Sequence, residues 1–485
     1  MKTLPVRKIG QNQDFPLISV AAASIGWILF IQFFGVEVIN ESTLFTRQQN
    51  APSLQGNHKN LKIELVTEGL YSPTSMAFVD DNKILVLEKN TGLVRLISDG
   101  VLQKLPVSKL PVDTKGERGL LGIAVLDNNN SGNNDRYYQS EKTLADYHNY
   151  ADTKNFKKML NDSSTAPSAV NTSVFLYFTE SNNNSTNDEQ LRNRIYKYEW
   201  NGQTLRNPTL ILDLPAIPGP YHNGGKLIIS PDHYLYAVIG DLIALGPLQN
   251  SKGDIQNHYD TSVIYRLNPE DGSPAKNNPF SHIPRNMTGS TELPLHLGSY
   301  YAYGIRNSFG ITFDPVTSSL WDTENGEDKY DEINVVKPGF NSGWAKIMGP
   351  LSRNHNNITR GDLVNFPGSY YSDPVFSWYL AIGITDIEFL KSSKLGDKYK
   401  NNLFVGDINN GNLYYFEVNE SRTGLKLEND DSKGLKDMVA DNKNELSEII
   451  FGSGFKGITD IQTGHDGYLY ILSYLDGKLY RIVAS

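Results

Sequence analysis

The stretch ITDIQTGHDGYLYILSYLDGKLYRI, residues 458–482, contains three short apolar segments separated by two tight turns. The segments are rich in Ile, Leu and Tyr, which favour β-strands, and the turns carry Asp and Gly, which favour chain reversal. A sheet of three such strands has two faces and cannot bury both without neighbours. The stretch therefore indicates one unit of a repeated β architecture.

Five earlier segments repeat this pattern of strands and turns. Their first strands are Ser75–Phe78, Gly122–Val125, Lys226–Ser230, Gly310–Phe313 and Ile384–Ile387. Six sheets of three or four strands predict an all-β, six-bladed β-propeller over residues 61–485, closed around a central channel. The Asn-rich stretch 127–173 falls between two strands of the second copy, which predicts a surface insertion.

The charge balance and the missing cysteines exclude several classes of function. The 485 residues include 45 Lys and Arg against 54 Asp and Glu, a net charge of −9. Nucleic-acid sites need clustered basic side chains that displace counterions from phosphates, so no nucleic-acid partner is expected. The absence of cysteine excludes disulfides, thiolate metal sites, a cysteine nucleophile and a bound iron–sulfur cluster.

An uncharged segment near the N-terminus predicts a membrane anchor. Residues 15–36 carry no charge, and 22 residues in a helix span about 33 Å, enough to cross a bilayer. Lys2, Arg7 and Lys8 precede the segment, which places residues 1–14 in the cytoplasm by the positive-inside rule. We expect a single-pass protein of the cell membrane, with a tether over 37–60 and an extracytoplasmic propeller. A cleaved signal peptide is the alternative.

Sequons for N-glycosylation all lie after the predicted anchor, as expected of an external glycoprotein, although chance in an Asn-rich chain is the alternative. They begin at Asn40, Asn129, Asn161, Asn171, Asn183, Asn184, Asn286, Asn357 and Asn419.

Charged residues recur just ahead of the first strands, where the chain enters a propeller near its channel. His222 and Arg306 each stand four residues ahead of their copy, and Lys456 precedes the sixth copy. Asp241 ends the strand that follows His222, so it could hold one imidazole nitrogen and leave the other to accept a proton. The alternative is that Asp241 only closes a turn.

The acidic stretch 324–332 predicts a calcium site, because Ca²⁺ prefers about six to eight oxygen ligands. Solvated turn residues are the alternative.

Several motifs resemble the soluble quinoprotein glucose/sorbosone dehydrogenase family, also called aldose sugar dehydrogenases. They are Glu117-Arg-Gly-Leu-Leu-Gly122, His222-Asn-Gly-Gly-Lys-Leu227, Gly240-Asp241, Tyr303-Gly-Ile-Arg306-Asn307, Glu324-Asn-Gly326, Asp331-Glu332-Ile-Asn334 and Gly343-Trp344. This family consists of six-bladed propellers that use pyrroloquinoline quinone (PQQ) and Ca²⁺, so the resemblance implies the same fold and cofactors here.

The resemblance also implies roles for single residues. His222 would be the base that takes the proton of the sugar C1 hydroxyl while hydride passes to the quinone, and Asp241 would orient it. Arg306 would stabilise negative charge on the quinone oxygens. Asn307 and Glu117 would contact the cofactor.

The implied metal ligands belong to two calcium ions. The backbone carbonyls of Gly326 and Glu327 would bind the ion beneath the quinone, and Glu332 would bind a second, structural one.

The chain departs from the family where the cofactor carboxylates bind. Asn409 occupies the place of a quinone-binding Lys, and Gly457 and Thr459 occupy the place of an Arg-x-Arg pair. PQQ carries three carboxylates, and each lost charge-assisted hydrogen bond removes about 1.5–3 kcal/mol. Lys456 is the cation expected to compensate.

A PQQ-dependent aldose sugar dehydrogenase is therefore the leading expectation, with a small sugar as substrate, an electron acceptor of unknown class, and the membrane as partner of the N-terminal helix. A catalytically silent carbohydrate-binding propeller and a Ca²⁺-dependent lactone hydrolase are the alternatives. Retention of His222, Asp241 and Arg306 favours the dehydrogenase, whereas the lost carboxylate partners favour the silent propeller.

Overall fold

The computed structural model describes residues 51–56, 58–128, 172–181, 191–251, 260–283, 296–354, 357–427 and 434–485. The predicted anchor at 15–36 and nearly all of the predicted insertion lie outside the described residues. Within the described ranges, no helix is long and apolar enough to cross a membrane. The residues from Asn50 onward form one compact unit.

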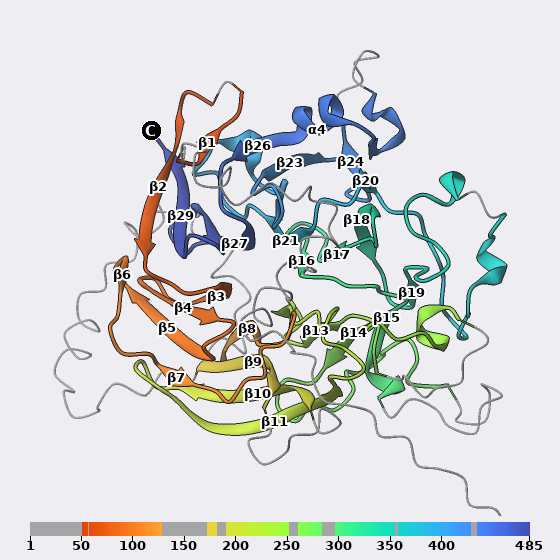
Figure 1. Ribbon diagram of the computed structural model, residues 1–485, viewed down its shortest axis with the longest axis horizontal. Coiled ribbons are helices and arrows are strands. Elements are labelled where there is room, and N and C mark those ends of the chain that lie inside the picture. The colour runs from red at the N-terminus through yellow and green to blue at the C-terminus, as the bar shows by residue number, and fades with distance from the viewer. Residues whose placement is uncertain are drawn as a thin grey trace, which may run out of the picture. The chain divides into compact units, whose positions relative to one another are not determined.

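Six sheets confirm the predicted six-bladed β-propeller (Figure 1). Blade 1 contains β3 (Pro73–Asp80), β4 (Lys83–Glu88), β5 (Leu93–Ser98), β6 (Val101–Leu102) and β7 (Ser108–Lys109). Blade 2 contains β8 (Leu120–Asp127), β9 (Thr172–Glu180), β10 (Arg192–Trp200) and β11 (Leu205–Pro215). Blade 3 contains β12 (Leu227–Ile229), β13 (Leu235–Ile239), β14 (Val263–Leu267), β15 (Tyr300–Tyr303) and β19 (Phe340–Asn341).

The other three blades follow in chain order. Blade 4 contains β16 (Gly310–Phe313), β17 (Leu320–Glu324), β18 (Lys329–Val336), β20 (Phe376–Leu380) and β25 (Val439–Ala440). Blade 5 contains β21 (Ile384–Phe389), β22 (Leu403–Asp407), β23 (Leu413–Val418), β24 (Leu425–Lys426), β26 (Ile450–Ser453) and β1 (Ser53–Leu54). Blade 6 contains β27 (Ile458–Thr463), β28 (Leu469–Ser473), β29 (Lys478–Ala484) and β2 (Leu61–Glu68).

Short helices lie between some of the strands. The α-helix α4 spans Lys443–Ile449, and the side chain of Asn442 caps its first turn. Single 3₁₀ turns occur at Pro247–Gln249, Leu297–Ser299, Leu351–Arg353, Arg360–Asp362, Asp397–Tyr399 and Leu435–Asp437.

The propeller closes by joining the two ends of the described chain in one sheet. β2 pairs with β29 antiparallel, from Leu61 opposite Ala484 to Glu68 opposite Lys478. The innermost strands β3, β8, β12, β16, β21 and β27 each contact the next, and β27 contacts β3 again. Ser53 and Leu54, within the predicted tether, form β1 and pair with β26.

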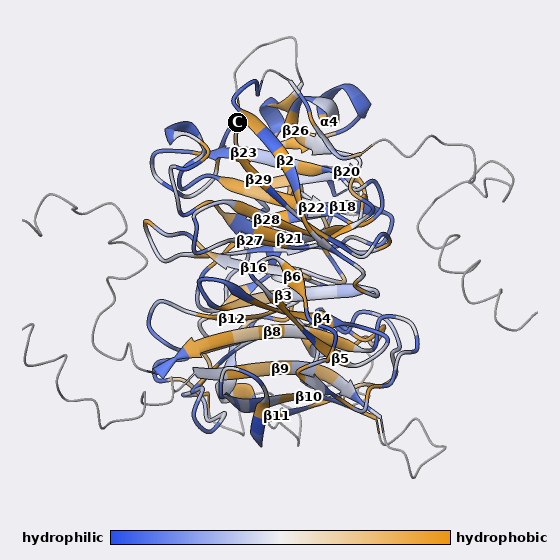
Figure 2. Cartoon of the chain, turned by 90° about the vertical axis from the view of Figure 1, so that its left-hand side faces the viewer, coloured by the Kyte–Doolittle hydropathy of each residue, from blue (hydrophilic) through white to orange (hydrophobic). Residues whose placement is uncertain are grey.

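Each blade buries both of its faces against neighbouring blades. Along β4, Ile84 and Val86 pack in one apolar cluster with Leu472 of blade 6, whereas Leu85 and Leu87 pack in another with residues of blade 2. Because alternate side chains point to opposite faces, both sets must be apolar, and the strand becomes a continuous apolar run. Figure 2 shows the resulting apolar strands between polar loops.

The loops that could form a site lie at one end of all six sheets. The second strand of each blade runs antiparallel to the first, so the segment entering the first strand lies beside the turn that follows the second. Leu227 pairs with Ala237, for example, which brings the His222 loop to the same end as Asp241. We call this end of the propeller the rim.

Candidate active site

His222 and Asp241 form a hydrogen-bonded pair at the rim. His222 Nδ1 lies 2.6 Å from Asp241 Oδ1, and the two side chains are 15% and 3% exposed. A carboxylate can only accept, so Nδ1 carries a proton, and in the neutral imidazole Nε2 holds the lone pair. Asp241 Oδ1 also accepts from the backbone N–H of Ile243 at 2.7 Å, so the carboxylate closes a turn as well as orienting the imidazole.

Glu117 and Asn307 hold the loop that carries His222. The backbone of His222 has φ 60°, a left-handed conformation that needs support from its surroundings. Glu117 Oε2 accepts from the His222 backbone N–H at 2.7 Å and from Asn307 Nδ2 at 3.3 Å. Asn307 Oδ1 accepts from the Gly224 N–H at 3.2 Å. Both predicted cofactor contacts therefore also fix the position of the predicted base.

Arg306 has hydrogen-bond donors that no described residue uses. Its Nη1 donates to the Asn325 carbonyl at 3.1 Å, and its backbone N–H donates to Glu324 Oε1 at 2.7 Å. Its Nε is buried and has no partner in the described part of the chain. A buried donor left without an acceptor is unfavourable, so the guanidinium suits an anionic or carbonyl ligand.

Trp344 contacts both Asp241 and Arg306, and the sequence reasoning did not identify it as a site residue. Its Nε1 donates to Asp241 Oδ2 at 2.7 Å, and the Arg306 Cζ lies 5.2 Å from its ring centroid. The only available signal was its place in the Gly343-Trp344 motif.

The predicted calcium ligands occupy two environments. Gly326 and Glu327 lie in the turn between β17 and β18, where Glu327 is exposed, whereas Glu332 is buried within the sheet. Asp331 caps this turn by accepting from the Gly326 N–H at 2.9 Å. No three His, Asp or Glu side chains of the described residues are arranged to hold a metal. A calcium ion beneath the rim therefore depends on backbone carbonyls and stays a prediction.

Besides Asp331, three buried carboxyl groups lie on β17 and β18 beside the predicted site. Glu324 pairs with Glu332 across the strands, and Asp322 pairs with Asn334. Burial raises the pKa of Glu324 to about 7 and raises the pKa values of Asp322 and Glu332 well above their ordinary range. Glu332 also accepts a short hydrogen bond from the Gly349 N–H. Burial thus favours the protonated form of Asp322 and Glu332 in this cluster.

Three of the positions expected to hold cofactor carboxylates carry no charge. Asn409 is exposed in the turn after β22, and Thr459 Oγ1 donates to the Pro73 carbonyl at 2.9 Å. Gly457 has φ 82°, and a Cβ there would lie 2.9 Å from the Ile408 carbonyl oxygen. Lys456 is half-buried at the rim, and its amine has no hydrogen-bond or ion-pair partner among the described residues. Lys456 is free to act as the compensating cation.

Lys89 is a second basic residue at the rim that the sequence reasoning missed. It follows β4, is 9% exposed, and donates from Nζ to the Gly116 carbonyl at 2.9 Å and to Asn90 Oδ1 at 3.1 Å. Burial lowers its pKa to about 8, against the opposing charges of Glu117 and Asp113. A lysine after a strand is usually solvated, so the sequence pattern offered no reason to single it out.

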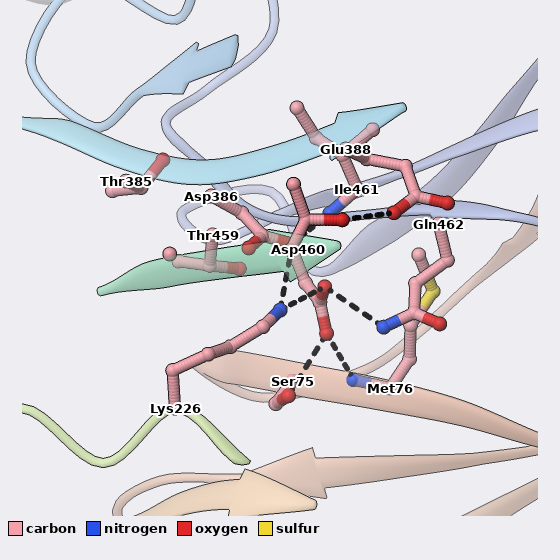
Figure 3. A network of polar contacts seen from close by, with 12 residues as sticks. Ser75, Met76, Lys226, Thr385, Asp386, Glu388, Thr459, Asp460, Ile461 and Gln462 are labelled. Atoms are coloured by element: carbon pink, nitrogen blue, oxygen red, sulfur yellow. Dashed lines mark hydrogen bonds and ion pairs between the residues drawn. The ribbon is translucent and has the colours of Figure 1, made fainter. Parts of the chain in front are cut away.

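A buried ionic cluster lies near the start of the inner strands (Figure 3). Lys226 Nζ lies 2.7 Å from Asp386 Oδ2 and 3.0 Å from Asp460 Oδ1. Asp460 Oδ2 accepts from Ser75 Oγ at 2.9 Å and from the Met76 N–H at 2.6 Å. These contacts join blades 3, 5, 6 and 1. Lys226 and Asp460 both stand in sequence motifs named above, but no sequence pattern predicts that they are in contact.

Comparisons with known proteins concern the family and the fold of the chain. The family model described as Glucose / Sorbosone dehydrogenase matches residues 154–481. Aldose sugar dehydrogenase YliI of Escherichia coli is 22% identical over 418 residues, 85% of this chain and 90% of that protein. Quinoprotein glucose dehydrogenase B of Acinetobacter calcoaceticus is 26% identical over 313 residues, 60% of this chain and 54% of that protein. The PQQ-bound aldose sugar dehydrogenase of Streptomyces coelicolor has the same fold, with a TM-score of 0.57, 20% identity, and coverage of 90% of this chain and 100% of that one.

Proposed function

The chain belongs to the glucose/sorbosone dehydrogenase family, and from this premise we propose that it oxidises aldose sugars at C1 with PQQ and Ca²⁺ as cofactors. The observation that carries the proposal is the hydrogen bond of 2.6 Å between His222 Nδ1 and the buried Asp241. This bond leaves His222 Nε2 as the acceptor for the proton of the C1 hydroxyl. A base held in one tautomer by a carboxylate is what removal of a hydroxyl proton requires.

The rim fits the reactive part of a quinone. When bound, PQQ supplies the acceptor for the hydride from C1. Arg306 offers a buried Nε that no described residue uses, and its positive charge would stabilise negative charge at the quinone oxygens. Gly326 and Glu327 would contribute backbone carbonyls to Ca²⁺. Asn307 and Glu117 would border the cofactor while holding the His222 loop.

The part of the rim that would bind the three cofactor carboxylates fits less well. Asn409, Gly457 and Thr459 carry no charge, and Lys456 is the nearest basic residue in sequence to the replaced Arg pair. This depletion favours a second candidate function, a propeller that binds carbohydrate without oxidising it. The two functions differ in whether PQQ binds, since a silent propeller needs no quinone.

The cellular location is also a proposal. The uncharged segment 15–36 and the basic residues before it support a single-pass anchor with the propeller outside the cytoplasm. An external propeller would meet environmental sugars directly.

The decisive experiment uses the purified full-length protein with PQQ, aldoses and a redox dye, with Ca²⁺ or with a calcium chelator. We expect sugar-dependent dye reduction that needs both cofactors. His222→Ala should lower turnover by about 100-fold or more, because general base catalysis contributes about 10²–10⁴-fold. The matched control His282→Ala changes an exposed histidine and should leave turnover unchanged.

Two results would contradict the dehydrogenase proposal. Full activity of His222→Ala would remove the base from the mechanism. Failure of the wild-type protein to bind PQQ, together with retained binding of sugars, would support the silent carbohydrate-binding propeller instead.

A further inference from the structure

We propose that Trp344 is the positioning residue that fixes both the base pair and the guanidinium of the site, an inference that rests on the proposed function. Its indole N–H donates to Asp241 Oδ2 at 2.7 Å, while Asp241 Oδ1 accepts from His222 Nδ1 at 2.6 Å. The two oxygens of the carboxylate thus have different partners. Rotation of the Asp241 carboxylate would break both hydrogen bonds, so the indole fixes the direction in which the imidazole points.

The same indole ring restrains Arg306. The guanidinium carbon lies 5.2 Å from the ring centroid, within the range of a cation–π contact. Contact with a ring occupies a face of the guanidinium and leaves its in-plane N–H groups for other partners. Of these groups, Nε is buried and has no hydrogen-bond partner within the described ranges. The Trp344 side chain therefore fixes the position of the His222 imidazole relative to the Arg306 guanidinium.

The backbone around Trp344 is held firmly enough for this role. The Trp344 N–H donates to the Gly304 carbonyl at 3.1 Å, and its carbonyl accepts from the buried Asn250 Nδ2 at 2.7 Å. The next N–H, of Ala345, donates to the Gln249 carbonyl at 2.7 Å. A side chain can position others only when its own backbone is fixed, and three hydrogen bonds provide that here.

The segment 342–345, which contains Trp344, is also connected to Arg306 through Glu324. Ser342 Oγ donates to Glu324 Oε2 at 2.5 Å, and Glu324 Oε1 accepts from the Arg306 backbone N–H at 2.7 Å. The segment 342–345 follows β19 in blade 3, whereas Arg306 and Glu324 border the first two strands of blade 4. The segment thus connects two blades at the point where the proposed chemistry occurs.

The test compares two tryptophans that differ in the use of the indole N–H. Trp344→Phe keeps an aromatic ring beside Arg306 but removes the hydrogen bond to Asp241. Trp378→Phe makes the same chemical change at a buried tryptophan whose Nε1 has no partner among the described residues. We expect Trp344→Phe to lower kcat by about 10- to 100-fold with a smaller change in KM, and Trp378→Phe to leave kcat near the wild-type value.

A double-mutant cycle separates positioning from packing. If Trp344 acts through Asp241, the loss of kcat in Trp344→Phe should largely disappear in an Asp241→Asn background, because the effects of coupled residues are not additive. Additive losses, or equal kcat values for Trp344→Phe and Trp378→Phe, would overturn the inference.

A spectroscopic measurement on the cofactor-free protein needs no catalysis. The indole N–H resonance that disappears in Trp344→Phe should exchange slowly with water in the wild type and quickly in Asp241→Ala. Slow exchange retained in Asp241→Ala would overturn the inference alone. An inactive wild-type protein with slow exchange lost in Asp241→Ala would instead overturn the proposed function, and the contact between Trp344 and Asp241 would stand.

Discussion

Replacing Lys226 by Met should destabilise the propeller, because Lys226 is the cation between two buried Asp side chains, one in blade 5 and one in blade 6. Its Nζ contacts Asp386 at 2.7 Å and Asp460 at 3.0 Å, and all three side chains are at most 9% exposed. Met has a similar length but no charge, so the substitution removes the cation and keeps most of the packing. The contacts to blades 5 and 6 would then be lost together.

The expected loss follows from the number and burial of these contacts. Two charge-assisted hydrogen bonds contribute about 1.5–3 kcal/mol each, and removing one member of a buried ion pair costs about 3–5 kcal/mol. Burial raises the pKa of Asp386 well above its ordinary value, so the Asp386 carboxylate can lose its charge by taking up a proton. Burial acts the same way on Asp460, but Lys226 and Asp386 outweigh it and lower the pKa of Asp460. We therefore expect a loss of about 3–5 kcal/mol at pH 7.

The pH dependence of this loss gives a second check. Without Lys226, burial would raise the pKa of Asp460 above its unfolded value, so the folded variant would bind more protons than the unfolded chain. Stability of the variant should then fall as pH rises, and its deficit relative to the wild type should be smaller at pH 4.5 than at pH 7.

Urea unfolding followed by tryptophan fluorescence measures both effects. The matched control is Lys89→Met, which removes a buried lysine whose Nζ bonds only a backbone carbonyl and an amide oxygen. Equal stabilities of Lys226→Met and Lys89→Met at pH 7, or a deficit independent of pH, would refute the reasoning that Lys226 compensates buried charge.

Three further predictions concern Lys89 and two of the positions where the cofactor-binding cations are replaced. Because burial lowers the pKa of Lys89 to about 8 from an ordinary value of 10.5, the folded protein binds fewer protons than the unfolded chain between these values. The urea-unfolding free energy of the wild type should therefore rise relative to Lys89→Met from pH 8 to pH 10, and a constant difference would show that the amine is not desolvated. Asn409→Lys should tighten PQQ binding by about tenfold or more in equilibrium titration, since one charge-assisted contact contributes at least about 1.5 kcal/mol. Gly457→Arg should instead lower stability, because φ 82° and the Ile408 carbonyl 2.9 Å from a Cβ disfavour any side chain there, and an unchanged unfolding midpoint would contradict this.

The strand pattern was readable from the sequence because each blade is a local unit. The alternation in residues 458–482 and its five relatives depends on neighbours two residues apart, and each copy forms its sheet mainly with its own strands. His222, Asp241 and Arg306 were identifiable for the same reason, since their places relative to the strands follow from the repeat. Because each copy repeats the same order of strands and turns, residues at equivalent places in different copies are predicted to lie together at the rim.

Contacts between residues far apart in the chain were decided only by the tertiary structure. Trp344 reaches Asp241 across 103 positions, and Lys226 reaches Asp460 across 234, and no periodic pattern marks either pair. The crowding that disfavours an Arg at Gly457 is likewise visible only in the tertiary structure, where an added Cβ would lie 2.9 Å from the Ile408 carbonyl oxygen. A sequence pattern specifies which face a side chain occupies, whereas closure of the propeller specifies which side chain of another blade it meets.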